Sequence, residues 1–254
     1  MRLLGKLWSR LRGPAAPVRR IRLVVDSQMA VGDFSLGCKY ETKLDKELLS
    51  RQVVLERKSS SDAKMRFLDV GGRDGKLRYL LGNTGPLRFD AQLHAVNRRK
   101  FEDAYNYFGI DLRPAGKNVL VGDLCMPDFV SRHSEFARVF DVVYSNNVFE
   151  HLRKPWIAAE NITNLLKPGG ICITIVPFAQ RYHEDPADYF RYTPAGIVSL
   201  FEDLGPIRVM HAGFDIRARR YDWQGGGDAN DIVPKDHFGA WRETWYTLVI
   251  LEKL

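Results

Sequence analysis

A glycine-rich turn interrupts an apolar run at residues 67–77, which read FLDVGGRDGKL. The run ends in Asp69, and Gly71, Gly72 and Gly75 follow before a segment with helical character. Glycine permits a tight turn and lets backbone N–H groups approach a ligand closely, which is the chemistry of a nucleotide-binding loop. A purely structural strand-to-helix turn would look similar, so this stretch alone leaves both interpretations open.

Two later aspartates also end apolar runs: Asp111 in YFGIDL and Asp123 in VLVGDL. A carboxylate at the end of a second strand can accept hydrogen bonds from both ribose hydroxyls of a nucleoside, and Asp123 is placed to accept from an adenine amino group. Asp111 follows Asp69 by 111 − 69 = 42 residues, about twice the usual spacing of roughly 20, which indicates an insertion near residues 83–106. Each aspartate singly could cap a loop, but three in this order favour one nucleoside site.

A polar and aromatic stretch follows the apolar run that ends in ITIVPF. Its polar and aromatic residues are Tyr182, His183, Glu184, Asp185, Asp188, Tyr189, Arg191 and Tyr192. Tyrosine rings can stack on a polyhydroxylated acceptor, carboxylates can bind its hydroxyls, and the imidazole of His183 can act as a general base. Alternatively, the stretch is a polar loop that caps the next helix, with Thr193 as N-cap and Pro194 at the first helical position. His151, in FEHL, is a second candidate base, or only a hydrogen-bonding partner of a neighbouring loop.

The sequence predicts no metal site. His183 and Glu184 could ligate a cation, but no second cluster with suitable spacing accompanies them. The three cysteines, Cys38, Cys125 and Cys172, lack metal-ligand spacing and are too few for a disulfide framework. A reducing compartment is therefore expected, and we predict a cytoplasmic protein.

The net charge of +7 is concentrated at the N-terminus. Residues 1–22 carry seven basic residues and no acid, so 31 basic and 31 acidic residues remain in the rest of the chain. This neutral body argues against a nucleic-acid partner. Residues 1–12 have apolar and basic residues on opposite helical faces, which suits an anionic membrane surface at the inner face of a membrane. A contact with a partner, a tail that is disordered or packed on the domain, and a targeting peptide are the alternatives.

Short apolar segments alternate with helix-compatible ones after residue 65, which predicts crossover units and a mostly parallel sheet covered on both faces. The expected strands are 66–70, 107–111, 117–122, 139–145, 170–177, 206–212 and 244–252. The expected helices are 45–58, 155–167 and 194–204. We predict a single domain over residues 23–254 with its core at about 66–252, and the glycine-rich stretch 222–238 is either a lid or a surface loop.

The order of these motifs resembles the class I S-adenosylmethionine-dependent methyltransferases. The most specific parts are LDVGGRDG, GIDL, VGDL, FDVVYSNNVFEHL and LLKPGGICITIV. The resemblance covers about residues 66–252. It implies an α/β fold, a Rossmann-like doubly wound sheet of seven strands that is mostly parallel, with WYTLVILEK as an antiparallel last strand.

The resemblance also implies S-adenosylmethionine as cofactor at the carboxyl ends of the first strands. Asp69 and the glycine backbone would surround its methionine part, Asp111 would hold the ribose, and Asp123 with Leu124 would hold the adenine. The full implied set is Asp69, Gly71, Gly72, Arg73, Gly75, Asp111, Leu112, Asp123, Leu124 and Asn146. Arg73 departs from the family pattern, which usually has a small residue there, so it either pairs with the cofactor carboxylate, points outward, or blocks the site.

The expected activity is O-methylation of a saccharide or another hydroxylated small molecule, for example a lipid-linked glycan. The stretch HEDPADYFRYT resembles bacterial members associated with polysaccharide synthesis. The implied acceptor-binding residues are Tyr182, Glu184, Asp188, Tyr189, Arg191 and Tyr192, with His183 or His151 as catalytic base. The alternative is a non-catalytic binding or assembly subunit that keeps the fold. Methylation of RNA or protein is a weaker alternative, because residues 145–148 read SNNV and not the NPPY-type motif of many base-amino methyltransferases.

Overall fold

The computed structural model describes residues 44–59, 62–72, 76–85, 88–113, 118–180, 182–184, 186–218 and 244–254. Several sequence predictions lie outside these residues. They concern the N-terminal segment 1–12, Arg73, Gly75, Asp185 and the glycine-rich stretch 222–238.

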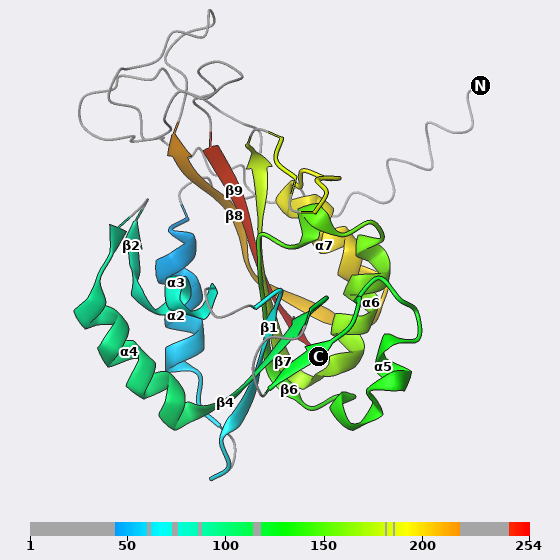
Figure 1. The fold of residues 1–254 in the computed structure, drawn as a ribbon, viewed down its shortest axis with the longest axis horizontal. Helices are drawn as coiled ribbons and strands as arrows, with labels where there is room; N and C mark the ends of the chain where they lie inside the picture. The colour runs from blue at the N-terminus through cyan, green and yellow to red at the C-terminus, as the bar shows by residue number, and fades with distance from the viewer. Residues whose placement is uncertain are drawn as a thin grey trace, which may run out of the picture.

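Seven strands form one sheet in the order β5-β4-β1-β6-β7-β9-β8 (Figure 1). Their bounds are β1 Met65–Val70, β4 Tyr105–Asp111, β5 Val119–Val121, β6 Phe140–Asn146, β7 Leu166–Ala179, β8 Ile207–Ala218 and β9 Thr244–Lys253. Strands β5, β4, β1, β6 and β7 pair in parallel, whereas β9 runs antiparallel to both β7 and β8. The predicted fold class, a mostly parallel seven-stranded sheet with an antiparallel last strand, is confirmed.

The sheet is covered by helices on both faces (Figure 1). One face carries α2 Lys46–Glu56, α3 Lys76–Gly82 and α4 Ala91–Ala104. The other carries α5 Phe129–Arg132, α6 Pro155–Leu165 and α7 Pro194–Glu202. Two short 3₁₀ helices, η1 Ser134–Phe136 and η2 Phe149–His151, complete that second face.

The region that sequence spacing marked as an insertion, residues 83–106, contains strands and a helix. It holds β2 Asn83–Gly85 and β3 Arg88–Phe89, which form a separate two-stranded antiparallel sheet, and then α4. Phe101 on α4 is buried against the main sheet. The long spacing between the first two aspartates therefore reflects a crossover that contains α3, this hairpin and α4.

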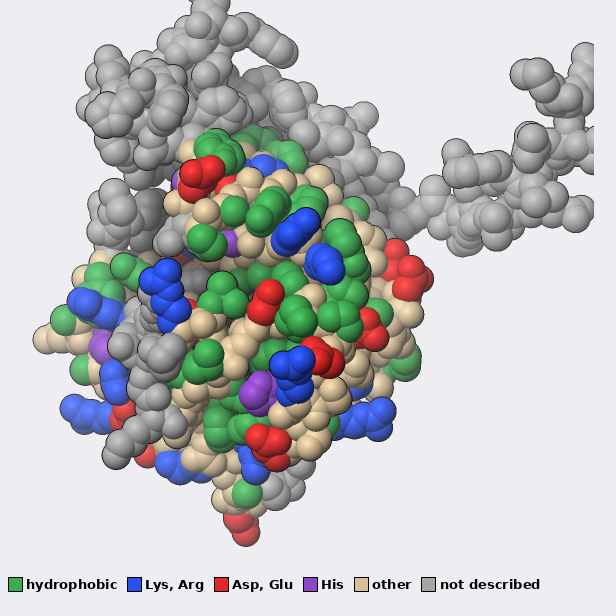
Figure 2. Space-filling model, turned by 45° about the vertical axis from the view of Figure 1, so that its right-hand side comes forward, with side chains coloured by type: hydrophobic (Ala, Val, Ile, Leu, Met, Phe, Trp, Pro, Cys, Tyr) green, Lys and Arg blue, Asp and Glu red, His purple; other side chains and the backbone are tan. Residues whose placement is uncertain are grey.

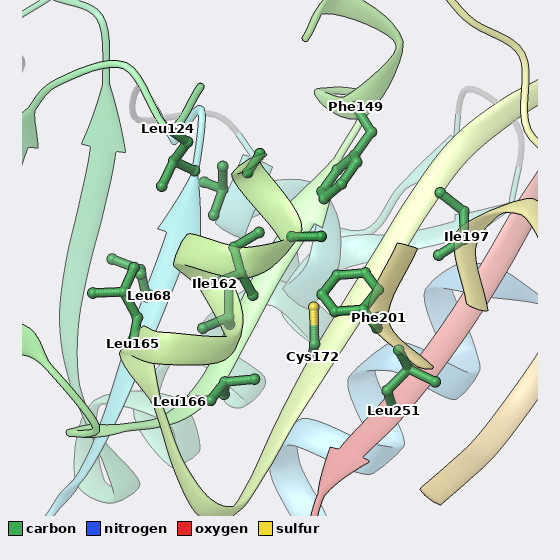
Figure 3. Packing of buried hydrophobic residues seen from close by; sticks show 14 of the residues in the cluster. Leu68, Leu124, Phe149, Ile162, Leu165, Leu166, Cys172, Ile197, Phe201 and Leu251 are labelled. Atoms are coloured by element: carbon green, nitrogen blue, oxygen red, sulfur yellow. The ribbon is translucent and has the colours of Figure 1, made fainter. Parts of the chain in front are cut away.

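Two apolar cores explain why the central strands read as continuous hydrophobic runs. Neighbouring residues of a strand face opposite sides, so Phe67 packs under α2, α3 and α4 while Leu68 packs under α6. Figure 3 shows the core under α6 and α7, where Phe149, Ile197 and Phe201 meet side chains of α6 and the sheet. Both cores fix the positions of the strand ends.

Local sequence signals set the helix starts. Asp45 and Asp90 precede α2 and α4, and their side chains accept from the amides of Leu48 and Leu93 at 2.9 Å. Thr193 accepts from the Gly196 amide at 3.0 Å before α7, and a proline occupies the first helical position. The predicted capping role of Thr193 is thus confirmed.

Acidic, basic and apolar side chains are interspersed on the face drawn in Figure 2. This mixture agrees with the equal numbers of basic and acidic residues after residue 22. Among the described residues, none of the helices combines the length and apolar character required to cross a bilayer.

Candidate active site at the carboxyl edge of the sheet

The three predicted cofactor-binding aspartates lie at the carboxyl ends of three adjacent strands. Asp69 on β1 pairs with Gly109 on β4, and Asp111 closes β4 opposite Val121 on β5. Asp123 follows β5 by two residues. Because parallel strands end at the same edge of a sheet, the three aspartates are brought to one edge, at the place where α/β proteins bind ligands.

The glycine turn is built around the side chain of Asp69. This carboxylate is fully buried, and one of its oxygens accepts from the hydroxyl of Tyr107 at 3.0 Å. A Cβ added to Gly72 would lie 2.4 Å from the Asp69 Cγ, so no larger residue fits there. Gly71 has φ 69°, a left-handed conformation that glycine adopts without strain. The turn therefore requires these two glycines for conformation and for space.

Backbone hydrogen bonds tie the turn to the neighbouring strand ends. The Gly71 amide donates to the carbonyl of Ile110 at 2.7 Å, and the Gly122 amide donates to that of Asp111 at 3.0 Å. These bonds continue the ladder past the last paired residues. The turn after β1 and the loop after β5 are consequently held against the end of β4.

Asp111 and Asp123 are more accessible than Asp69. Asp111 is half-buried and accepts from the amide of Arg113 at 3.0 Å, and Asp123 is exposed and accepts from the amide of Cys125 at 2.8 Å. Leu112, beside Asp111, is 59% exposed. The two carboxylates are thus presented at the edge of the sheet.

The side chain of Leu124 packs in the apolar core. It is 3% exposed and belongs to the core under α6, and its carbonyl accepts from the side-chain amide of Asn161 at 2.9 Å. The sequence could not separate this side chain from its neighbour Asp123, because an apolar residue after a strand can face either the ligand or the core. The side chain and carbonyl of Leu124 anchor the loop that carries Asp123, and its contact with the adenine stays a prediction.

Two tyrosines support this edge and were not identified from the sequence. Tyr144 is fully buried on β6, and its hydroxyl oxygen accepts from the side-chain amide of Asn146 at 3.1 Å. Burial, and then the negative charge of Asp69, hold the pKa of Tyr144 well above its usual value, so it stays protonated. Tyr107 supports Asp69 directly. Their signal in the sequence was a tyrosine within an otherwise apolar strand, which is equally common in ordinary cores.

The predicted acceptor segment is organised around Asp188. The side chain of Asp188 is 1% exposed, and Arg191 donates to both of its carboxylate oxygens, with Arg191 Nη2 at 2.6 Å from Oδ2. The backbone amide of His183 donates to Asp188 Oδ2 at 2.8 Å, and His183 Nδ1 lies 3.4 Å from the same oxygen. The hydrogen bonds from Arg191 lower the pKa of Asp188 to about 2, although burial opposes this shift. Asp188 is therefore an anion that fixes both neighbours.

His151 lies beside His183. The two rings meet edge to face with their centroids 5.1 Å apart, and His151 Nδ1 lies 2.6 Å from the carbonyl oxygen of Ala187. His151 therefore makes the expected hydrogen bond to a neighbouring loop, and its role as a base stays a prediction. Glu150, the preceding residue, is fully buried with one carboxylate oxygen 3.7 Å from His151 Nε2. Glu150 was not identified from the sequence, where its only signal was a charged residue directly before a histidine at a strand end.

The other acceptor-binding candidates divide into surface and core residues. Tyr182 is 64% exposed with its hydroxyl hydrogen-bonded to Glu184, which raises the pKa of Tyr182, and Tyr189 is 49% exposed. Tyr192 instead is 7% exposed, packs near Phe149, and donates its hydroxyl to the Phe149 carbonyl at 3.1 Å. Burial raises the pKa of Tyr192 above its usual value. Tyr192 thus occupies a core position, because its aromatic ring completes the apolar cluster under α7.

The hydrogen-bond acceptors at this edge fit an adenosyl cofactor. The ribose hydroxyls and the adenine amino group of S-adenosylmethionine are donors, and Asp111 and Asp123 offer carboxylate acceptors at neighbouring strand ends. Gly71 and Gly72 keep the turn after β1 compact enough for its backbone to approach a ligand.

We expect Asp111→Ala to weaken S-adenosylmethionine binding by about 1–3 kcal/mol, because two charge-assisted hydrogen bonds to the ribose would be lost. Isothermal titration of the purified protein measures this change. Glu135→Ala, which removes a carboxylate from η1 on the protein surface, is the control. An unchanged dissociation constant for Asp111→Ala would contradict the ribose role.

Comparisons with known proteins agree with this geometry. The family described as methyltransferase domain matches residues 40–216. Among solved structures, a proposed methyltransferase from Bacillus halodurans is 10% identical, with 82% of this chain and 98% of that chain covered and a TM-score of 0.50. The YcgJ protein of Bacillus subtilis is 13% identical, with 81% and 98% covered and a TM-score of 0.47.

The solved-structure likeness concerns the fold, whereas the family match rests on the sequence. A search of curated protein sequences found no match. The family match spans most of the chain. It includes every strand of the seven-stranded sheet except β9 and the last two residues of β8. This chain belongs to the methyltransferase domain family, for which S-adenosylmethionine is the implied methyl donor.

Proposed function

We propose that the protein transfers a methyl group from S-adenosylmethionine to a hydroxyl of a saccharide or another polyhydroxylated small molecule. The observation that carries this proposal is the Arg191–Asp188–His183 arrangement, in which a buried anion fixes an imidazole. The arrangement follows β7 directly, and β7 lies two strands from β1 in the sheet that carries the candidate cofactor edge.

The chemistry requires alignment and removal of one proton. When bound, S-adenosylmethionine supplies an activated methyl group, so the protein must orient the acceptor oxygen in line with it. Asp188, near Nδ1 of His183, favours the proton on that nitrogen and leaves the lone pair on Nε2. In this proposal Nε2 of His183 takes the hydroxyl proton as the acceptor oxygen attacks.

The proposed acceptor class follows from the side chains of this segment. Tyr182 and Tyr189 expose aromatic surface on which a sugar ring can stack, and Glu184 is an exposed carboxylate beside Tyr182 that can bind hydroxyls. Apolar stacking combined with carboxylate acceptors suits a polyhydroxylated ring better than a flat heterocyclic base. A lipid-linked glycan combines such a ring with a membrane anchor.

A labelled-methyl assay tests the proposal. Purified protein is incubated with S-adenosylmethionine carrying a labelled methyl group and with a panel of nucleotide sugars, lipid-linked glycans and phenols. The expected result is label on an oxygen of a glycan or sugar that survives mild acid and base treatment, as an ether does. Label on nitrogen or carbon, or on phenols alone, would refute the acceptor class. Cofactor binding without transfer to any acceptor would favour a non-catalytic subunit.

We further propose that residues 1–12 bring the enzyme to an anionic membrane surface. Their basic and apolar residues alternate with helical spacing. Deleting residues 1–13 should therefore abolish sedimentation with vesicles that contain phosphatidylglycerol, while phosphatidylcholine vesicles serve as the control. Equal sedimentation of the full-length and truncated proteins would reject this role.

A further inference from the structure

Three potential metal ligands converge beside the candidate active site. They are Glu150 and His151 in η2 and His183 in the segment after β7. One ligand atom from each lies within 4.8 Å of the others, and Glu150 Oε1 is 3.7 Å from His151 Nε2. Ligand atoms bound tetrahedrally at about 2.0–2.1 Å lie roughly 3.4 Å apart. Small side-chain movements would therefore bring the three atoms around one ion.

The surroundings of both imidazoles orient them as metal ligands usually are. His151 Nδ1 lies 2.6 Å from the carbonyl of Ala187, and His183 Nδ1 lies 3.4 Å from the carboxylate of Asp188. An acceptor at Nδ1 keeps the proton there and puts the imidazole lone pair on Nε2. Oxygen acceptors behind metal-binding histidines have this role, because they fix the tautomer and the ring orientation.

The two parts of the cluster are also tied together by the backbone. The carbonyl of Glu150 accepts from the amides of Tyr189 and Phe190, at 2.7 and 3.3 Å. These bonds hold the segment after His183 against η2. The ligands come from distant parts of the chain. The hydrogen bonds to the Glu150 carbonyl hold these two parts together.

The local charge favours a cation. Glu150 and Asp188 contribute two negative charges, and Arg191, which is paired with Asp188, contributes one positive charge. With neutral imidazoles these side chains carry a net charge of −1 between them, which attracts a cation. Two imidazoles and one carboxylate form the ligand set of catalytic zinc sites and of related first-row metals, with a coordination position left for water or substrate.

We propose that Glu150, His151 and His183 bind one divalent transition-metal ion, with Zn²⁺ as the best match. This site was not predicted from the sequence, where Glu184 was considered beside His183. Glu184 instead is exposed and hydrogen-bonded to Tyr182.

The consequence for catalysis rests on the proposed function. A cation at this position would bind the acceptor hydroxyl and lower its pKa, so that the proton leaves to solvent. The acceptor oxygen then forms its bond to the methyl carbon as the sulfur–methyl bond breaks, and the electron pair of that bond stays on sulfur. His183 would in that case hold the cation and not take the proton itself.

Metal binding is measured first without cofactor or acceptor. The full-length protein is stripped with chelator, titrated with Zn²⁺ and, separately, with Co²⁺, whose visible absorption reports four- or five-coordinate geometry. We expect one ion per chain. His183→Ala, which changes a half-exposed residue in a loop, should weaken Zn²⁺ affinity by more than roughly a hundredfold, since even supporting partners contribute about 10–100-fold. Asp188→Asn should weaken it by about 10–100-fold.

His211→Ala is the matched control, because His211 is a half-buried histidine on β8 outside the cluster. It should bind Zn²⁺ as the unmodified protein does. Glu150→Gln, with its fold checked by circular dichroism, should lose the ion while keeping nearly the same side-chain shape. Absence of stoichiometric binding, or equal affinity in the His183→Ala and His211→Ala proteins, would overturn the site. Zinc binding in a protein that transfers no methyl group would leave the site standing and reject the proposed function, whereas full transfer activity after chelation would reject only the metal's catalytic role.

Discussion

Replacing Gly72 with alanine is expected to lower the free energy of unfolding by about 1–3 kcal/mol and to reduce the affinity for S-adenosylmethionine by up to roughly a hundredfold. The added Cβ would lie 2.4 Å from Asp69 Cγ and 2.5 Å from Oδ2. Asp69 cannot retreat easily, because its side chain is fully buried and hydrogen-bonded to Tyr107. The turn must therefore shift, and the loss of backbone hydrogen bonds to the cofactor costs about 1–3 kcal/mol, which is up to roughly a hundredfold in affinity.

Thermal unfolding and cofactor titration measure the two effects of Gly72→Ala. Gly196→Ala is a suitable control, because the nearest atom to its new Cβ would be Thr193 Oγ1 at 3.3 Å and the position lies on α7. That variant should keep cofactor affinity. Normal affinity in the Gly72→Ala protein would show that the turn does not cradle the cofactor.

Replacing His183 with alanine is expected to slow turnover at least roughly a hundredfold and to leave cofactor affinity unchanged. The imidazole is fixed by Asp188 at the proposed acceptor side, whereas the aspartates predicted to bind the cofactor belong to β1, β4 and the loop after β5. Its loss should therefore remove either the base or a ligand of the activating cation, and not the adenosyl site.

Single-turnover transfer of the labelled methyl group, with saturating cofactor, measures the effect of His183→Ala. The His211→Ala protein should react at the unmodified rate, since His211 lies on the edge strand β8. A normal rate for His183→Ala would dismiss this residue from the chemistry. If His183→Ala weakened cofactor affinity by a factor as large as the expected loss of rate, the segment after β7 would support the adenosyl site instead.

The convergence of Asp69, Asp111 and Asp123 at one edge of the sheet could be predicted from the sequence because its signals are local. Each aspartate stands at the end of an apolar run, and the direction of parallel strands places such ends together. The strand boundaries were close for the same reason, since a buried strand between turn residues has a clear apolar pattern. Two boundaries differed by more than two residues. β7 begins at Leu166, before the Pro-Gly-Gly turn, because Leu166 pairs with Phe140 across a register shift. β8 continues to Ala218, six residues beyond its expected end, because it stays paired with β9.

The acceptor side could be predicted only in part because its contacts are long-range. The sequence placed His183 and Asp188 in one segment, but nothing in it indicated that Glu150 would lie against them. Tyr192 was expected at the acceptor site but packs in the core. A tyrosine in a polar stretch looked like a ligand-binding residue, whereas its ring completes the core and its hydroxyl satisfies the Phe149 carbonyl.

The central claim is that acidic residues at three adjacent strand ends surround one adenosyl group. Isothermal titration of the purified protein with S-adenosylmethionine tests it most directly. The account predicts saturable binding of one cofactor per chain, displaced by S-adenosylhomocysteine and weakened by Asp111→Ala. No heat of binding at millimolar cofactor would contradict it.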